Sequence, residues 1–308
     1  MRAGGRGSGC RTAIAGRSIV GRRELSGNER DRRELTKCSI TVRAGCLIQG
    51  YFVPMTAFAA GAPCWADVML PDLEAGKRFY GELFGWTFSA GSAEHGGYTQ
   101  AYRDGRAAAG LMPKPDGRLP TAWTIYFATP DAARTSAKIL EAGGRIVSEA
   151  VPVGDLGTML VATDPTGAVF SVWQAGTHPG FEVTGEPGAY VRTGLSTRDP
   201  QGADAFYGAV FGFESVADSP ASDERFRPWR LAGQKEEIGG RALMGDRVPA
   251  EMPPHFTVCF LVAAMDDAVR TATRLGGRVT AEPITTPGGP FAVLTDNQGA
   301  AFGVLSPK

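Results

Sequence analysis

The chain has 308 residues, of which 43% are hydrophobic and 21% charged, a composition typical of a soluble globular protein with room for two domains. No stretch approaches the roughly 18 to 20 consecutive apolar residues that cross a bilayer, so we expect no membrane partner. Residues 1–54 hold 11 of the 32 basic residues but only 4 of the 32 acidic ones, which leaves an acidic remainder. Because an acidic body lacks the basic face that phosphates require, we expect no nucleic acid partner either.

The first part of the chain, residues 1–58, mixes Gly, Ser and Arg without hydrophobic periodicity, which predicts a disordered basic extension. The Arg22-Arg23 pair is not followed by the apolar core of a twin-arginine export signal. Met55 stands just before the patterned region and is an alternative start. The five cysteines show no CxxC spacing, which predicts reduced thiols and a cytoplasmic protein.

An internal repeat follows this extension. Residues 71–86 (PDLEAGKRFYGELFGW) recur as residues 198–213 (RDPQGADAFYGAVFGF), an offset of 127. Two later landmarks recur in the same order: GGRI at 143–146 returns as GGRV at 276–279, and DPTG at 164–167 returns as DNQG at 296–299. A match that keeps its order over this length indicates a duplicated domain.

Each copy reads as two βαβββ modules. In the first, a strand over 64–70 precedes a helix that begins at the capping Asp72 and ends at Gly85, with strand-like runs at about 86–90, 97–103 and 106–112. Its second module has a strand at 123–129, a helix over 131–142 and strands at 145–149, 157–163 and 168–174. The second copy repeats this order. Its first module has a strand at 189–197 and a helix that begins at Asp199-Pro200, and its second module has a strand at 256–263 and a helix over 266–275, followed by strands to residue 305. We therefore predict an α+β fold with domains over 59–177 and 189–308 and a linker over 178–188.

Paired βαβββ modules, with an Asp-led helix ending in Phe-Tyr…Phe-Gly-Trp and a late Asp-Pro-x-Gly turn, resemble the vicinal oxygen chelate superfamily. This superfamily includes glyoxalases, bleomycin resistance proteins and extradiol dioxygenases, and the resemblance covers residues 60–308. It implies two glyoxalase-like domains with curved mixed sheets, each folded around an open cleft lined by alternate strand residues.

The metal positions that the resemblance implies hold unsuitable residues in both copies. The resemblance implies one ligand seven residues before the helix-capping Asp (Asp72 or Asp199), one in the second module, and one seven residues after the Asp of the late turn (Asp164 or Asp296). In the first copy these positions hold Trp65, Thr124 and Ser171. In the second copy they hold Arg192, Thr257 and Gly303. Divalent metals of this family need imidazole and carboxylate ligands. The three histidines, His95, His178 and His255, fit ordinary loop or surface positions better. We predict no metal site and no cofactor.

The first cleft is predicted to be aromatic. Strand alternation places Trp65, Asp67 and Met69 on one face, together with residues of the second module, Thr124, Tyr126, Ser171 and Trp173. This lining suits a flat or apolar molecule oriented by one carboxylate and a few hydroxyls, although the tryptophans could equally fill core volume. Asp67 is either a structural or ligand-orienting group or a candidate catalytic base.

The second cleft differs in its residues. Arg192, Gly194 and Ser196 replace the residues of the first strand, with Thr257 and Cys259 facing them. Arg192 is either a surface arginine or a group that holds a carboxylate or phosphate in a bidentate contact. Cys259 is a reactive thiol only if it is exposed in an electropositive setting.

Three functions remain open from the sequence. The missing metal ligands favour a protein that binds a small organic molecule, as bleomycin resistance relatives do. The alternatives are a metal-independent lyase, isomerase or hydroxylase that uses Asp67 as its base, and a structural or regulatory module. The sequence leaves a homo-oligomer open.

Overall fold

A computed structural model describes residues 58–246 and 248–308. The expected disorder of residues 1–57 and the alternative start at Met55 lie outside the described residues. None of the helices in the described part is long and apolar enough to span a membrane.

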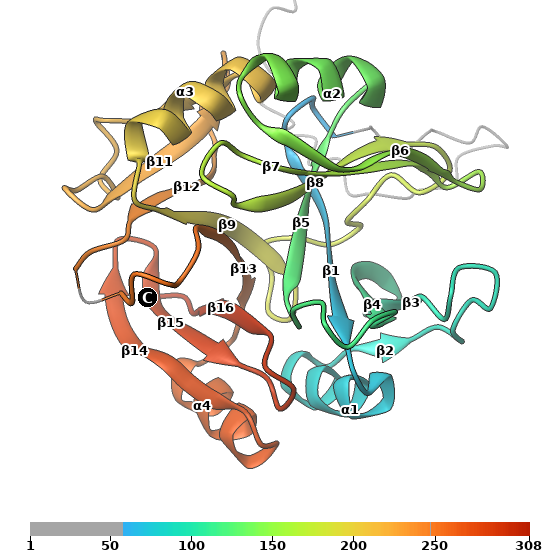
Figure 1. Cartoon of the computed structure of the whole chain (residues 1–308). Coiled ribbons are helices and arrows are strands. Elements are labelled where there is room, and N and C mark those ends of the chain that lie inside the picture. Colours follow the sequence, from blue (N-terminus) through green and yellow to red (C-terminus); the bar gives the residue numbers. More distant parts are fainter. Residues whose placement is uncertain (1–57, 247) are drawn as a thin grey trace, which may run out of the picture. The chain divides into compact units, whose positions relative to one another are not determined.

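The first repeat forms one mixed sheet with the strand order β2-β3-β4-β1-β5-β8-β7-β6 (Figure 1). The strands β1 and β5 are antiparallel neighbours at its centre, and each pairs in parallel with the last strand of its own module. The elements are β1 (Pro63–Leu70), α1 (Leu73–Phe84), β2 (Thr87–Phe88), β3 (Thr99–Arg103), β4 (Arg106–Pro113), β5 (Trp123–Ala128), α2 (Ala132–Glu141), β6 (Arg145–Val153), β7 (Gly157–Thr163) and β8 (Val169–Ala175).

The second repeat forms an equivalent sheet in the order β10-β11-β12-β9-β13-β16-β15-β14. Its elements are β9 (Tyr190–Thr197), α3 (Pro200–Phe211), β10 (Phe213–Ser215), β11 (Phe226–Leu231), β12 (Glu237–Leu243), β13 (His255–Leu261), α4 (Met265–Arg274), β14 (Arg278–Thr286), β15 (Gly289–Thr295) and β16 (Ala301–Leu305). The predicted α+β fold of four βαβββ modules is confirmed.

The helix boundaries follow the capping residues that the sequence predicts. Asp72, Asp131 and Asp199 each accept a hydrogen bond from a first-turn amide of α1, α2 and α3. Gly85 and Gly212 end α1 and α3 with φ of 71° and 75°, the left-handed conformation that suits glycine. Helix α4 differs, because Ala264 at its N-cap makes no side-chain cap.

The two sheets pack through the faces that carry their helices, which we call the inner faces. Trp123 of β5 packs on Phe260 of β13 with ring centroids 5.0 Å apart, and Phe127 packs on Phe256 at 5.6 Å. Helices α1 and α4 lie side by side at one end of this contact and α2 and α3 at the other (Figure 1). The outer faces, which carry Trp65 in one sheet and Arg192 in the other, remain for a binding site.

Candidate functional site

The outer face of the first sheet brings the predicted residues together. Trp65 pairs in register with Tyr126, and Tyr126 with Ser171, so these three side chains lie on one rung across β1, β5 and β8. Asp67 pairs with Thr124 on the next rung, and the Tyr126 and Trp173 rings meet edge to face at 6.5 Å. Met69 lies farther along β1 and is half-buried. The alternation read from the sequence therefore describes this face correctly.

The face differs from the expected open cleft, because its central side chains are buried. Trp65, Asp67, Tyr126 and Trp173 are each at most 7% exposed, and Ser171 is fully buried. The covering groups are Tyr98, which precedes β3 and forms an isolated β-bridge with Ser92, and His178 and Phe181, which lie in the irregular segment between the repeats.

Asp67 is a buried acid with two tyrosine partners. The Tyr126 hydroxyl donates to its Oδ2 at 2.8 Å and the Tyr98 hydroxyl at 3.4 Å. Burial raises the pKa of Asp67 from 3.8 to about 7, against the opposing effect of the two hydrogen bonds. Burial also raises the pKa of both tyrosines, and the nearby Asp67 charge adds to it, so both hydroxyls stay protonated donors. The site thus holds a carboxyl group that changes charge near neutral pH.

Tyr98 is the residue at this site that sequence reasoning missed. Its hydroxyl accepts a hydrogen bond from the Trp65 indole at 2.7 Å as well as reaching Asp67. A Cβ added at Gly110, the register partner of Asp67, would lie 2.5 Å from the Tyr98 ring carbon Cζ and closer still to its hydroxyl. The tyrosine ring therefore occupies space that a side chain at position 110 would take. The available signal was a glycine in the middle of a strand, which often marks a close approach.

The irregular segment between the two repeats also covers this face. The His178 ring packs edge to face on Trp65 at 4.5 Å, and the Trp173 indole donates to the His178 carbonyl at 2.8 Å. Phe181 lies 5.4 Å from Trp65 and stacks on Tyr190 at 4.7 Å. His178 lies in the irregular segment between the repeats, as expected, but it is half-buried, and this burial lowers its pKa.

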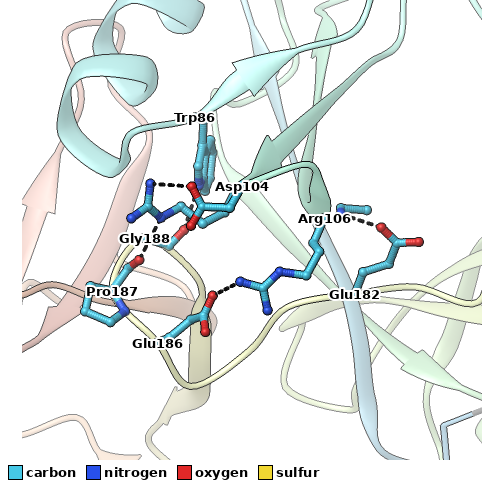
Figure 2. A network of polar contacts seen from close by, with 9 residues as sticks. Trp86, Asp104, Arg106, Glu182, Glu186, Pro187 and Gly188 are labelled. Atoms are coloured by element: carbon cyan, nitrogen blue, oxygen red, sulfur yellow. Dashed lines mark hydrogen bonds and ion pairs between the residues drawn. The ribbon is translucent and has the colours of Figure 1, made fainter. Parts of the chain in front are cut away.

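Polar contacts fix this segment to the first repeat (Figure 2). Glu186 points toward Arg106 and forms an ion pair with it, and Glu182 accepts a hydrogen bond from the Ala107 amide at 2.7 Å. The Trp86 indole donates to the Gly188 carbonyl at 2.6 Å, beside the pair formed by Arg103 and the Pro187 carbonyl. These contacts hold His178 and Phe181 over Trp65.

Two buried polar atoms at this face have no hydrogen-bond partner among the described residues. Ser171 Oγ and His178 Nε2 are both buried and make no hydrogen bond of normal length, although Ser171 lies close enough to the Tyr126 hydroxyl to oppose the rise of its pKa. Buried polar groups are normally satisfied, so each such group calls for an explanation. Both belong to residues that line or cover the face centred on Trp65.

The outer face of the second sheet has the same register but different burial. Arg192, Cys259 and Gly303 lie on one rung, and Gly194 pairs with Thr257 on the next. Arg192, Gly194 and Thr257 are half-buried, whereas Cys259 is 3% exposed. Burial raises the pKa of the Cys259 thiol to about 11 although Arg192 opposes this shift, so the thiol stays protonated and does not fit a reactive nucleophile.

Comparison with known proteins agrees with this architecture. Residues 65–172 match the model of the glyoxalase/bleomycin resistance protein/dioxygenase superfamily, and residues 192–305 match a glyoxalase-like domain. Over 256 residues the chain is 37% identical to a Mycobacterium tuberculosis protein named putative glyoxylase CFP32, covering 81% of this chain and 96% of that one. The chain belongs to the glyoxalase/bleomycin resistance protein/dioxygenase superfamily.

Other known proteins are similar along the same length. The anthracycline biosynthesis protein DauV of Streptomyces sp. strain C5 is 37% identical over 266 residues, covering 82% of this chain and 95% of the relative. The Mn(II)-bound glyoxalase from Novosphingobium aromaticivorans matches with a TM-score of 0.57 at 19% identity, over 80% of this chain and 82% of that chain. The 2,3-dioxygenase LapB from Pseudomonas sp. KL28 matches with the same TM-score of 0.57 at 16% identity, over 80% and 93% of the two chains. At these identities the two solved structures show the shared fold alone.

One structurally similar protein is bound to manganese, so the residues on each outer face bear on whether a divalent metal fits there. The central rungs are Trp65, Tyr126 and Ser171 in one sheet and Arg192, Cys259 and Gly303 in the other. Neither rung holds an imidazole or a carboxylate. Within residues 58–246 and 248–308 no three His, Cys, Asp or Glu side chains are grouped to hold a metal ion. The residues present do not fit the metal site of the family's metal-dependent enzymes.

Proposed function

We propose that the protein binds a flat, hydroxyl- or carbonyl-bearing small molecule on the outer face of its first sheet, and that it does so without a divalent metal. The bound molecule lies between Trp65, Asp67, Tyr126 and Trp173, with Met69 and Thr124 at the edge of the site. Tyr98 moves aside when the molecule enters, because its ring occupies the space over Gly110.

The observation that carries this proposal is the pair of unpartnered atoms, Ser171 Oγ and His178 Nε2, at the face that also holds Asp67. Leaving such groups buried and unsatisfied costs roughly 1 to 3 kcal/mol each. A ligand that bonds them recovers this free energy. The aromatic rings around them supply apolar contact area with defined geometry, which suits a planar body.

Tyr98 indicates what kind of group the ligand carries. Its phenol hydroxyl accepts from the Trp65 indole at 2.7 Å and lies 3.4 Å from Asp67, a longer distance than the 2.8 Å of Tyr126. A ligand hydroxyl in the position of the Tyr98 hydroxyl would keep the hydrogen bond from the Trp65 indole. It would also form a shorter hydrogen bond to Asp67. The names of two relatives, DauV and DnrV, refer to anthracycline biosynthesis, and an anthracycline is a planar, hydroxylated aromatic molecule. This supports a hydroxylated aromatic as the ligand class.

Quenching of tryptophan fluorescence by a dihydroxyanthraquinone tests the proposal. Binding beside Trp65 and Trp173 should quench the wild-type protein, and Trp65→Ala should weaken binding by ~1 to 3 kcal/mol through lost apolar contact. Trp229, on the inner face of the second sheet, is the matched control, and Trp229→Phe should leave the affinity unchanged. Equal affinity of the Trp65→Ala variant and the wild type would move the binding site elsewhere.

A second function, metal-independent acid–base catalysis, is favoured by one specific observation. Asp67 has a pKa of about 7, the range in which a carboxylate is an effective general base at neutral pH. In Asp67→Asn an enzyme of this kind should lose roughly 10² to 10⁴ in rate while it still binds its substrate. A simple binding protein should show a change in affinity only. The candidate substrates are the small molecules that stay bound after purification, identified by mass spectrometry.

A further inference from the structure

The second sheet has open space where the first sheet has Asp67. Gly194 stands five residues before Asp199, as Asp67 stands five residues before Asp72. Among the described residues, a Cβ added at Gly194 would meet only the Gly240 carbonyl oxygen at 4.0 Å, although one added at Gly240, the counterpart of Gly110, would meet the Phe226 ring at 2.6 Å. In the part of the chain that the structure describes, the outer face of the second sheet therefore has an unfilled position directly over Gly194.

A cation with no counterion among residues 58–246 and 248–308 lies next to this space. Arg192 is half-buried, two residues before Gly194 on the same face of β9, and takes part in none of the ion pairs found in the described part of the chain. Of the other half-buried arginines, Arg106 and Arg241 pair with Glu186 and Asp204, whereas Arg227 of β11 also has no ion pair in the described part of the chain. The neighbour of Arg192 in register is the Cys259 thiol, which is protonated and does not neutralise it.

Aromatic side chains stand on both sides of the space. The Arg192 guanidinium carbon lies 5.7 Å from the Phe291 ring centroid, a cation–π distance that restrains the guanidinium plane. Phe291 lies over Gly303 of β16, and on the other side Phe226 lies over Gly240 of β12, because a Cβ at either glycine would meet the ring within 3.0 Å. Strands β12 and β16 are separated by β9 and β13, so the rings flank a width of three strand spacings, roughly 14 Å.

We propose that this face is a separate binding site for an aromatic carboxylate, with the Arg192 guanidinium holding the carboxylate and the aromatic body lying over Gly194 between Phe226 and Phe291. The planar guanidinium offers paired donors that match the two carboxylate oxygens. The Thr257 hydroxyl, on the register partner of Gly194, is placed to bond the same group. One cation matches one negative charge, which favours a carboxylate over a phosphate dianion. The site shares no residue with the one around Asp67, so either stands without the other.

Isothermal titration calorimetry of the full chain with naphthoate tests this site. We expect binding to the wild type, and about 10- to 100-fold weaker binding to Arg192→Gln, the loss typical of one charged hydrogen-bonding partner. Naphthalene methanol, which keeps the rings without the charge, should bind weakly to both proteins. Inorganic phosphate should show no binding, because it lacks the aromatic body.

Two further variants separate a local site from a general charge effect. Arg278→Gln removes an exposed arginine of β14 in the same sheet and should leave naphthoate affinity unchanged. Gly194→Asp installs the residue of the first repeat, places a carboxylate beside Arg192 and should abolish binding at an unchanged melting temperature. The proposal is overturned if the wild type fails to bind naphthoate at millimolar concentration, if Arg192→Gln binds it as tightly as the wild type, or if naphthalene methanol binds equally well.

Discussion

The Tyr80 hydroxyl, on the helix of the first repeat, donates a 2.8 Å hydrogen bond to Asp296 Oδ2 in the late turn of the second repeat. The reciprocal bond runs from Tyr207 to Asp164 Oδ2 at 3.2 Å. Each aspartate also holds its own turn, as Asp296 Oδ1 accepts from the amides of Gln298 and Ala300 at 2.8 Å. The Phe-Tyr motif of each copy therefore stabilises the Asp turn of the other copy, and the two domains fold against each other.

Tyr80 and Tyr207 differ in the number of their hydrogen-bonding partners, so removing each hydroxyl should lower the free energy of unfolding by a different amount. Tyr80 also accepts a bond from the Trp123 indole at 3.0 Å. Tyr80→Phe leaves a buried carboxylate oxygen and an indole N–H unsatisfied and should cost about 2 to 4 kcal/mol, whereas Tyr207→Phe leaves one group and should cost about 1 to 3 kcal/mol. Urea unfolding measures both costs. Tyr102→Phe, at a half-buried hydroxyl bonded to Gln100, is the control, and equal costs for Tyr80 and Tyr102 would contradict the argument.

These hydrogen bonds between the two copies could not be predicted from the sequence repeat. The aspartate caps and alternating strand residues depend on local geometry, so the helix starts at Asp72 and Asp199 and the shared face of Trp65 and Asp67 follow from the sequence. Helical periodicity identifies the apolar side of α1, but it does not say which sheet that side packs against. That Tyr80 reaches Asp296, 216 residues away, is therefore visible only in the structure.

At the candidate site, too, some residues could be predicted from the sequence and others could not. Strand alternation assigned Tyr126, Ser171 and Trp173 to the face of Asp67, and the register agrees. Tyr98 lies in the run 97–103 predicted as a strand, but strand periodicity does not say that its hydroxyl reaches Trp65 and Asp67 of β1. His178 lies in an irregular segment, where side-chain directions follow no period. Tyr98 beside Asp67 and His178 on Trp65 change the site from the expected open cleft into a covered face.

Metal content is the next prediction. Because Trp65 and Ser171 in one sheet, and Arg192 and Gly303 in the other, offer neither imidazole nor carboxylate, we expect protein purified without chelator to contain far less than one divalent metal per chain. Elemental analysis measures this directly. Near-stoichiometric zinc, nickel, iron or manganese, with a melting temperature that falls on dialysis against EDTA, would contradict it.

The buried Asp67 makes stability depend on pH in a defined direction. Its pKa is raised from 3.8 to about 7 on folding, so the folded state binds this proton more tightly, and its contribution to stability is complete below pH 3.8 and lost as pH rises through 7. Asp67→Asn lacks this titration. Its free energy of unfolding relative to wild type should therefore rise between about pH 4 and 7, by up to about 1.4 kcal/mol per pH unit, and then level off. A difference that is constant from pH 4 to 8 would mean that Asp67 is not buried as an acid.

The contact between Tyr98 and Gly110 predicts that a single methyl group uncovers the site. In Gly110→Ala the new Cβ would overlap the Tyr98 ring, and the ring can turn away because it follows Gly96 and Gly97, both at positive φ. Such overpacking should cost about 1 to 3 kcal/mol of stability. It should also remove the Tyr98 partner from Trp65 and expose that indole to acrylamide. Stern–Volmer quenching of the variant should therefore be stronger than that of the wild type.

Gly110→Ala also tests whether a ligand can displace the Tyr98 ring or whether this ring is a fixed part of the core. If the ligand competes with Tyr98 for the space over Gly110, moving the ring away in advance removes that competition, and Gly110→Ala should bind the dihydroxyanthraquinone more tightly than the wild type. Gly117→Ala, at a position where an added Cβ meets nothing within 4 Å, is the matched control and should change neither quenching nor affinity. Repeating the quenching in Trp65→Phe assigns the signal, since the effect of Gly110→Ala should vanish there. A variant that loses stability without added quenching would show that Tyr98 stays in place and that the first face is a closed core.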